Sequence, residues 1–180
     1  MENLIIDIEN IIAKVSQWQH LEQSTLNWKP SPEKWSVYEC LEHLNRYANY
    51  YFPVLQNALT QQGKGQAKAI QYTWFGKFSI RSVHPDNQKA QKTLKHLNPN
   101  QSDLDDSTLR EFLAFQNQFI QILSAAQTVD FNTIKIPVEF FKLIKLRGGE
   151  CLEFLTRHQQ RHIQQAERVL SKVENIATIN

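Results

Sequence analysis

The sequence predicts an all-α fold, a four-helix bundle with a long crossover between its second and third helices. Apolar residues recur at helical spacing in four long segments, and proline and glycine punctuate the stretches between them. With 41% hydrophobic and 21% charged residues, the 180-residue chain can bury one core and is too short to expect two. We therefore expect a single domain over residues 1–180.

The first predicted helix spans residues 4–18, where apolar side chains recur at intervals of three and four residues. Pro30 and Pro32 end this pattern, because proline lacks an amide donor and restricts the residue before it. The second predicted helix spans residues 37–59. Pro53 lies inside this segment and is expected to kink the helix or to end it early.

The start of the second helix carries a capping signal and a histidine. Ser36 and Glu39 form a capping box, and Trp35 is placed to pack against Cys40 as a hydrophobic staple. Counting from this cap puts His43 almost two turns into the helix, on the stripe that faces the core. We therefore expect His43 to be buried or to bind a ligand.

The long crossover covers residues 61–100, where glycine and proline are frequent and only residues 88–97 have a helical pattern. Its aromatic residues argue against disorder, so we expect it to fold across the bundle, over the mouth of a site. Trp74 is expected either to line a substrate pocket or to plug the bundle.

The third and fourth helices complete the predicted bundle. Thr108 and Glu111 form a second capping box, and the helix that follows continues to about residue 127. Between residues 129 and 147, the run 131–137 is β-like in composition but isolated, so we expect an extended loop whose apolar side packs on the bundle and whose lysines are solvated. The fourth helix is predicted over residues 150–173.

The fourth helix carries the pair His158 and His162. Two histidines four residues apart lie on one face of a helix, close enough to bind a single metal ion, and His43 is the candidate third ligand. The alternatives are a solvated helix flank for the pair and a hydrogen-bonded core histidine for His43. A peptidase is disfavoured, because Gln159 stands where a zincin helix carries its catalytic glutamate.

The motif Trp-Ser-x-x-Glu-x-x-x-His-Leu, from Trp35 to Leu44, together with the histidine pair of the last helix, resembles the DinB superfamily. The resemblance covers most of the chain. It implies a four-helix bundle in which His43, His158 and His162 hold a divalent metal ion. Zinc and nickel are the first candidates for that ion, and iron and manganese come next.

The resemblance implies a metal-dependent enzyme that acts on a small molecule, foremost a thiol-dependent S-transferase using a low-molecular-weight thiol, or else a hydrolase. A general base is not identified, because Glu42, Glu153 and Glu167 cannot be placed in the site from the sequence. Two alternatives stay open. One is a non-catalytic bundle, monomeric or homodimeric, with a structural histidine cluster; the other is a module that binds a small ligand without metal.

Charge and cysteine content narrow the partners and the location. The net charge is +2, from 20 Lys and Arg against 18 Asp and Glu, so neither nucleic acid nor a membrane is an expected partner. Two cysteines, Cys40 and Cys151, cannot form a disulfide framework, and we expect both in the core. The first residues do not fit a secretory signal, which indicates a cytoplasmic protein. Gln165 is expected either to support a histidine ligand or to face solvent.

Overall fold

The computed structural model is dominated by four long helices: α1 (Glu2–Gln17), α3 (Val37–Thr60), α5 (Asp106–Ala126) and α6 (Gly148–Ile179). Two shorter helices, α2 (Gln23–Asn27) and α4 (Trp74–Val83), and two strands, β1 (Lys135–Val138) and β2 (Phe141–Arg147), complete it. The structure describes residues 1–62, 65–66, 68–87, 89, 92–139 and 141–179. The predicted all-α bundle is confirmed, apart from the two short strands.

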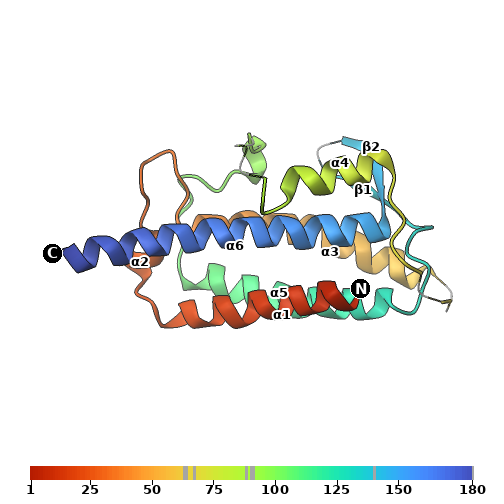
Figure 1. The fold of residues 1–180 in the computed structure, drawn as a ribbon, viewed down its shortest axis with the longest axis horizontal. Helices are drawn as coiled ribbons and strands as arrows, with labels where there is room; N and C mark the ends of the chain where they lie inside the picture. The colour runs from red at the N-terminus through yellow and green to blue at the C-terminus, as the bar shows by residue number, and fades with distance from the viewer. Residues whose placement is uncertain (63–64, 67, 88, 90–91, 140, 180) are drawn as a thin grey trace.

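The four long helices pack as a bundle. Helix α3 packs against α5 and α6, and α1 packs against the same two helices. Helix α4 lies along α6 on the side away from α1 and α5, next to the β-hairpin (Figure 1). Among the described helices, none has an apolar stretch long enough to cross a lipid bilayer.

Helix α3 begins as predicted and ends within one residue of the predicted end, so Pro53 does not end it early. The Ser36 hydroxyl accepts from the Glu39 amide at 3.1 Å, and the Glu39 carboxylate accepts from the Ser36 amide at 2.9 Å, which is the expected capping box. The helix continues through Pro53 to Thr60. Pro53 is exposed, so the backbone carbonyl that loses its partner one turn earlier lies on the solvent side, where the loss is tolerated.

The helix expected over residues 88–97 is wrong for the part of that range that the structure describes. Residues 92–94 belong to no helix or strand and Lys95–Leu97 form one 3-10 turn, whereas residues 88, 90 and 91 lie outside the described residues. The helix of the crossover is α4 instead, which packs on α6 and buries Ile80 and Val83. Trp74 neither lines the cavity described below nor plugs the bundle: it is 80% exposed and stacks on Phe78.

Helix α5 starts earlier than predicted. Its cap is Asp105, whose carboxylate accepts from the Ser107 amide at 2.8 Å, and the predicted capping box at Thr108 is therefore wrong. Thr108 lies inside the helix and is buried. Aspartate caps a helix at least as well as threonine does, so the helix can begin at Asp105, three residues before the predicted cap.

The extended loop expected over residues 129–147 is wrong as well. Strands β1 and β2 form an antiparallel hairpin in which Ile136 lies opposite Leu146, and both side chains are buried. The expectation that the apolar side of this segment packs on the bundle is confirmed for Ile136, Val138 and Leu146, which belong to the core, whereas Leu143 of β2 is 84% exposed. At the turn into α6, a Cβ on Gly148 would lie 2.7 Å from the carbonyl oxygen of Phe131, so this close approach requires glycine.

Candidate metal centre

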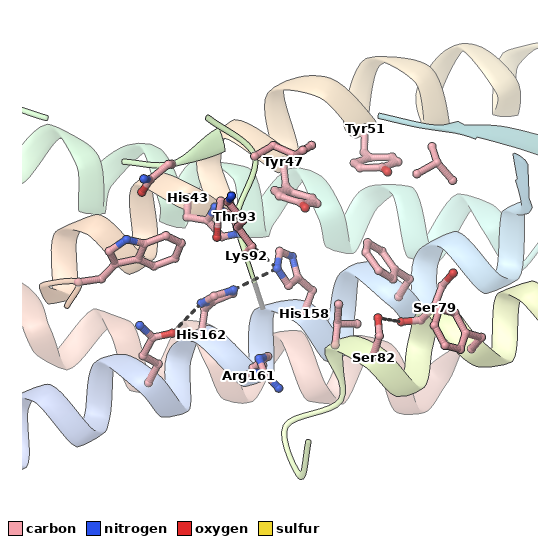
Figure 2. A pocket seen from close by; sticks show the side chains of 18 of the residues that line it. His43, Tyr47, Tyr51, Ser79, Ser82, Lys92, Thr93, His158, Arg161 and His162 are labelled. Carbon is pink, nitrogen blue, oxygen red and sulfur yellow. Dashed lines mark hydrogen bonds between the residues drawn. The ribbon is translucent and has the colours of Figure 1, made fainter. Parts of the chain in front are cut away.

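The three histidines singled out from the sequence meet in one buried cluster. His43 comes from α3, and His158 and His162 come from successive turns of α6 (Figure 2). The Nε2 atom of His158 lies 3.3 Å from Nε2 of His43 and 3.0 Å from Nε2 of His162. All three side chains are at least nine-tenths buried. The solvated flank considered for the pair is therefore excluded.

The outer nitrogens of two rings are held by neighbouring groups. Nδ1 of His43 lies 2.8 Å from the main-chain oxygen of Leu97, which can only accept, so His43 carries its proton on Nδ1. Nδ1 of His162 lies 3.1 Å from Oε1 of Gln165, and donates in the same way. The Nε2 lone pairs of both rings consequently point into the cluster. Gln165 supports a histidine, the first of the two roles considered for it.

Burial keeps the three imidazoles neutral. It lowers the pKa of His43 to about 4 and the pKa values of His158 and His162 well below the ordinary value. The neighbouring imidazoles of the cluster add to this lowering at His158 and His162. Neutral imidazole is the form that binds metal ions.

The cluster fits a divalent metal ion. The Nε2 atoms of His43 and His162 lie 3.3 and 3.0 Å from Nε2 of His158, which carries at most one proton and so can donate to only one of the two lone pairs turned towards it. Metal–nitrogen bonds of about 2.0 to 2.1 Å in a tetrahedral site separate two ligand nitrogens by about 3.3 Å, close to the observed distances. Nδ1 of His158 is buried and has no hydrogen-bond partner within the described part of the chain.

Aromatic rings surround the cluster. Trp35, expected only as a staple, has its ring centroid 4.8 Å from that of His43 and 5.5 Å from that of His162. Tyr47 lies 4.4 Å from His158 between ring centroids, and Phe154 stacks on His158 at 5.8 Å. Sequence reasoning missed Phe154, although its position one turn before His158 on the same helix was a usable signal.

The histidines form part of the wall of a cavity of about 900 Å³. Helices α3, α4 and α6, the segment 92–94 and residues of the hairpin enclose it (Figure 2). A volume of this size accommodates a drug-sized molecule. The expectation that the crossover folds over the site is confirmed, because α4 and residues 92–94 belong to this cavity.

Two arginines fasten the crossover to the site helices. Arg161, between His158 and His162 on α6, donates to the main-chain oxygens of His84, Asn87 and Lys89, the last at 2.8 Å. Each contact uses a backbone carbonyl rather than a side chain of the crossover. The turn of α6 that carries the two histidines therefore also holds the first half of the segment that covers them.

Arg46, one turn beyond His43 on α3, holds the second half. It donates to the main-chain oxygens of His96 at 3.2 Å and Asn98 at 2.9 Å, and to the Ser102 hydroxyl at 3.1 Å. Nδ1 of His43 also contacts the main-chain oxygen of Leu97. The hydrogen bonds from α3 to the crossover are therefore accepted mainly by backbone carbonyl groups of the crossover.

The three glutamates that the sequence could not place each have another partner. Glu42 pairs with Arg46 at 2.7 Å, Glu167 pairs with Lys14 at 2.7 Å, and Glu153 contacts Tyr72 and Arg157. Glu39, expected to serve only the cap, also accepts from Lys29 and from the Gln101 amide. Within the described residues, Glu33 is the one carboxylate among those that line the cavity.

Both cysteines lie in the core, as expected. Cys40 and Cys151 are free and fully buried, and burial raises the pKa values of both thiols. A buried protonated thiol behaves as a small apolar side chain. Neither cysteine belongs to the histidine cluster that could hold a metal ion.

Comparison with known proteins agrees with this arrangement. The sequence profile of the DinB superfamily matches residues 15–166. The uncharacterized protein YuaE of Bacillus subtilis (strain 168) is 25% identical over 167 residues, which cover 90% of this chain and 95% of YuaE. No solved structure gives a significant match.

Proposed function

Since the chain belongs to the DinB superfamily, we propose that it is a metal-dependent enzyme acting on a small molecule, foremost a thiol-dependent S-transferase. One observation carries the proposal: three neutral, buried imidazoles converge in the wall of a cavity of about 900 Å³. A structural metal site is closed by four protein ligands, whereas a catalytic site keeps a position open towards substrate. Three ligands facing a large cavity fit the second description.

In this proposal His43, His158 and His162 hold a divalent ion, with zinc and nickel as first candidates and iron and manganese next. When bound, such an ion supplies Lewis acidity and lowers the pKa of a thiol or water at its open position. The protein supports this chemistry by orienting the rings. The Leu97 carbonyl and the Gln165 amide hold two of the ligands with Nε2 turned inward.

The composition of the wall favours a thiol over water as the nucleophile. Water is far less acidic than a thiol, so a hydrolase depends more strongly on a general base beside the nucleophile. The one carboxylate among the described lining residues is Glu33, which is adjacent in sequence to Lys34 at the Trp35 end. Tyr47 lies beside His158, and burial raises the pKa of its phenol to about 12, so it stays protonated and can donate a hydrogen bond. Hydrolysis remains the second candidate reaction.

The test begins with elemental analysis of protein made without a polyhistidine tag. We expect about one divalent ion per chain in the wild type and none in His43→Ala and His158→Ala. His84→Ala, at the exposed end of α4, is the matched control and should keep the ion. Full metal occupancy in both cluster variants would refute the proposed ligand set.

Activity is then measured with L-cysteine as the thiol and 1-chloro-2,4-dinitrobenzene as the electrophile. Metal-loaded protein should form the thioether faster than buffer does, and His158→Ala should not. If chelation lowers the melting temperature but the loaded protein accelerates neither transfer nor hydrolysis, the metal is structural. We also propose a cytoplasmic location, where low-molecular-weight thiols are kept reduced, and sedimentation of the same samples tests the homodimer.

A further inference from the structure

The cavity has different chemistry at its two ends. Trp35 lines it just before α3, and along α3 the lining residues run from His43 through Tyr47 to Tyr51 (Figure 2). Along α6 they run from Gln165 and His162 to Phe154. The histidine cluster therefore lies between a Trp35 end and a Tyr51 end.

The Tyr51 end presents aromatic ring faces. Tyr47 stacks on Tyr51 with 6.0 Å between ring centroids and 20° between planes, and Phe154 stacks on His158. Phe75 of α4 lines this end as well. The Tyr51 hydroxyl already accepts from the Glu139 amide at 3.1 Å, and the Ser82 hydroxyl donates to the main-chain oxygen of Ser79, so the wall offers ring faces together with a few hydroxyl groups.

Charged side chains gather elsewhere on the wall. Glu33 and Lys34 precede Trp35, and Lys92 belongs to the segment that crosses above the histidines. Among the described residues that line the cavity, the remaining charged one is Arg161. Its guanidinium already donates hydrogen bonds to backbone carbonyls of the crossover. A negatively charged substrate group at the Tyr51 end would therefore be buried against rings without a counter-charge.

We propose that the Tyr51 end binds a flat, uncharged aromatic group of the electrophilic substrate, while the charged end admits the thiol; this rests on the function proposed above. Stacking on aromatic side chains favours a flat ring, and burial of an unpaired charge would cost free energy. In the reaction the thiol sulfur forms a bond to the electrophilic carbon, and the carbon–halide bond breaks. The halide leaves with the bonding electrons, and the thiol proton passes to the buffer.

The test compares three electrophiles with L-cysteine on metal-loaded protein. 1-Chloro-2,6-dinitrobenzene is neutral and aromatic, 4-chloro-3,5-dinitrobenzoate is the same ring with a carboxylate para to the chlorine, and iodoacetamide is small. After correction for the uncatalysed rates, kcat/KM should favour the neutral ring over the carboxylate by at least about tenfold. Equal values for the two rings would overturn the proposal.

A pair of variants locates the effect. Ser79→Trp fills the aromatic end without touching the histidines, and Lys77→Trp adds the same side chain to an exposed position of α4. Ser79→Trp should lose activity with the neutral ring by at least about tenfold and keep iodoacetamide turnover within about twofold. Lys77→Trp should match the wild type, and metal content should be unchanged in both. Unchanged turnover of the neutral ring in Ser79→Trp would overturn the assignment.

A binding measurement separates this inference from the proposed function. N-phenyl-1-naphthylamine, a neutral aromatic dye, should bind the wild type and Lys77→Trp at least about tenfold more tightly than Ser79→Trp. If this holds while no electrophile is turned over, the aromatic subsite stands and the transferase proposal fails. If the dye binds all three proteins equally, the subsite is refuted whatever the activity.

Discussion

The buried histidines should make the metal-free protein lose stability as the pH falls below neutrality. His43 is 2% exposed, and burial lowers its pKa from the ordinary value of 6.5 to about 4. Between these two values the unfolded chain binds a proton that the folded chain does not. The stabilisation is therefore fully present above pH 6.5 and is lost as the pH falls towards 4.

The size of the effect follows from those two pKa values. Relative to about pH 8, His43 alone should lower the free energy of unfolding by about 2 kcal/mol at about pH 5. His158 and His162 shift in the same direction and should add to the loss. Because the side chain of His43 is almost completely buried, solvent screening does not reduce its share.

Urea unfolding in the presence of a chelator measures this effect. The free energy of unfolding is determined at about pH 8 and about pH 5 for the wild type, His43→Gln and the exposed control His84→Gln. The loss between the two pH values should be about 2 kcal/mol smaller in His43→Gln than in the other two. Carboxylate titrations are common to all three proteins and cancel. An equal loss in all three would refute the reasoning.

Three further predictions concern packing and access. Gly76→Ala should lower the free energy of unfolding by about 1–3 kcal/mol, measured by urea denaturation, because a Cβ there would clash with the buried Glu150 carboxylate. Arg46→Met should raise amide hydrogen exchange in residues 95–102 at least about tenfold, measured by mass spectrometry, because it removes charged hydrogen bonds to that segment. Cys40 and Cys151 should react with a thiol reagent such as 5,5′-dithiobis(2-nitrobenzoic acid) only after denaturation, since burial raises both pKa values. Rapid labelling of the native protein would contradict that access argument.

The parts of the molecule that the sequence predicted well are those set by local geometry. The capping box at Ser36 depends on residues three positions apart, and it fixes the helical phase of His43. The spacing of His158 and His162 places both on one face of α6. Once α3 and α6 pack against each other, these two local features are enough to bring the three histidines together.

The parts that sequence reasoning missed depend on distant contacts. Helix α4 has only ten residues, and a helix of that length is marginal on its own, so its stability comes from packing on α6. Glu150 is fully buried and accepts from the amides of Thr73 and Arg147, which ties the start of α6 to the crossover and the hairpin. Strand β2 likewise forms only because β1 pairs with it. No pattern of neighbouring residues in the sequence predicts these distant contacts.

The attachment of the crossover through carbonyl oxygens has a consequence for engineering. Main-chain oxygens of the crossover accept hydrogen bonds from Arg161, Arg46 and His43. Every residue type has the same carbonyl group, so these bonds do not depend on the side chains of the crossover. Substitutions at Lys92, Thr93 and Leu94, which face the cavity, therefore leave these anchors in place. A library of variants confined to these three positions is therefore expected to change the shape and charge of the cavity wall while the bundle and the histidine cluster stay the same.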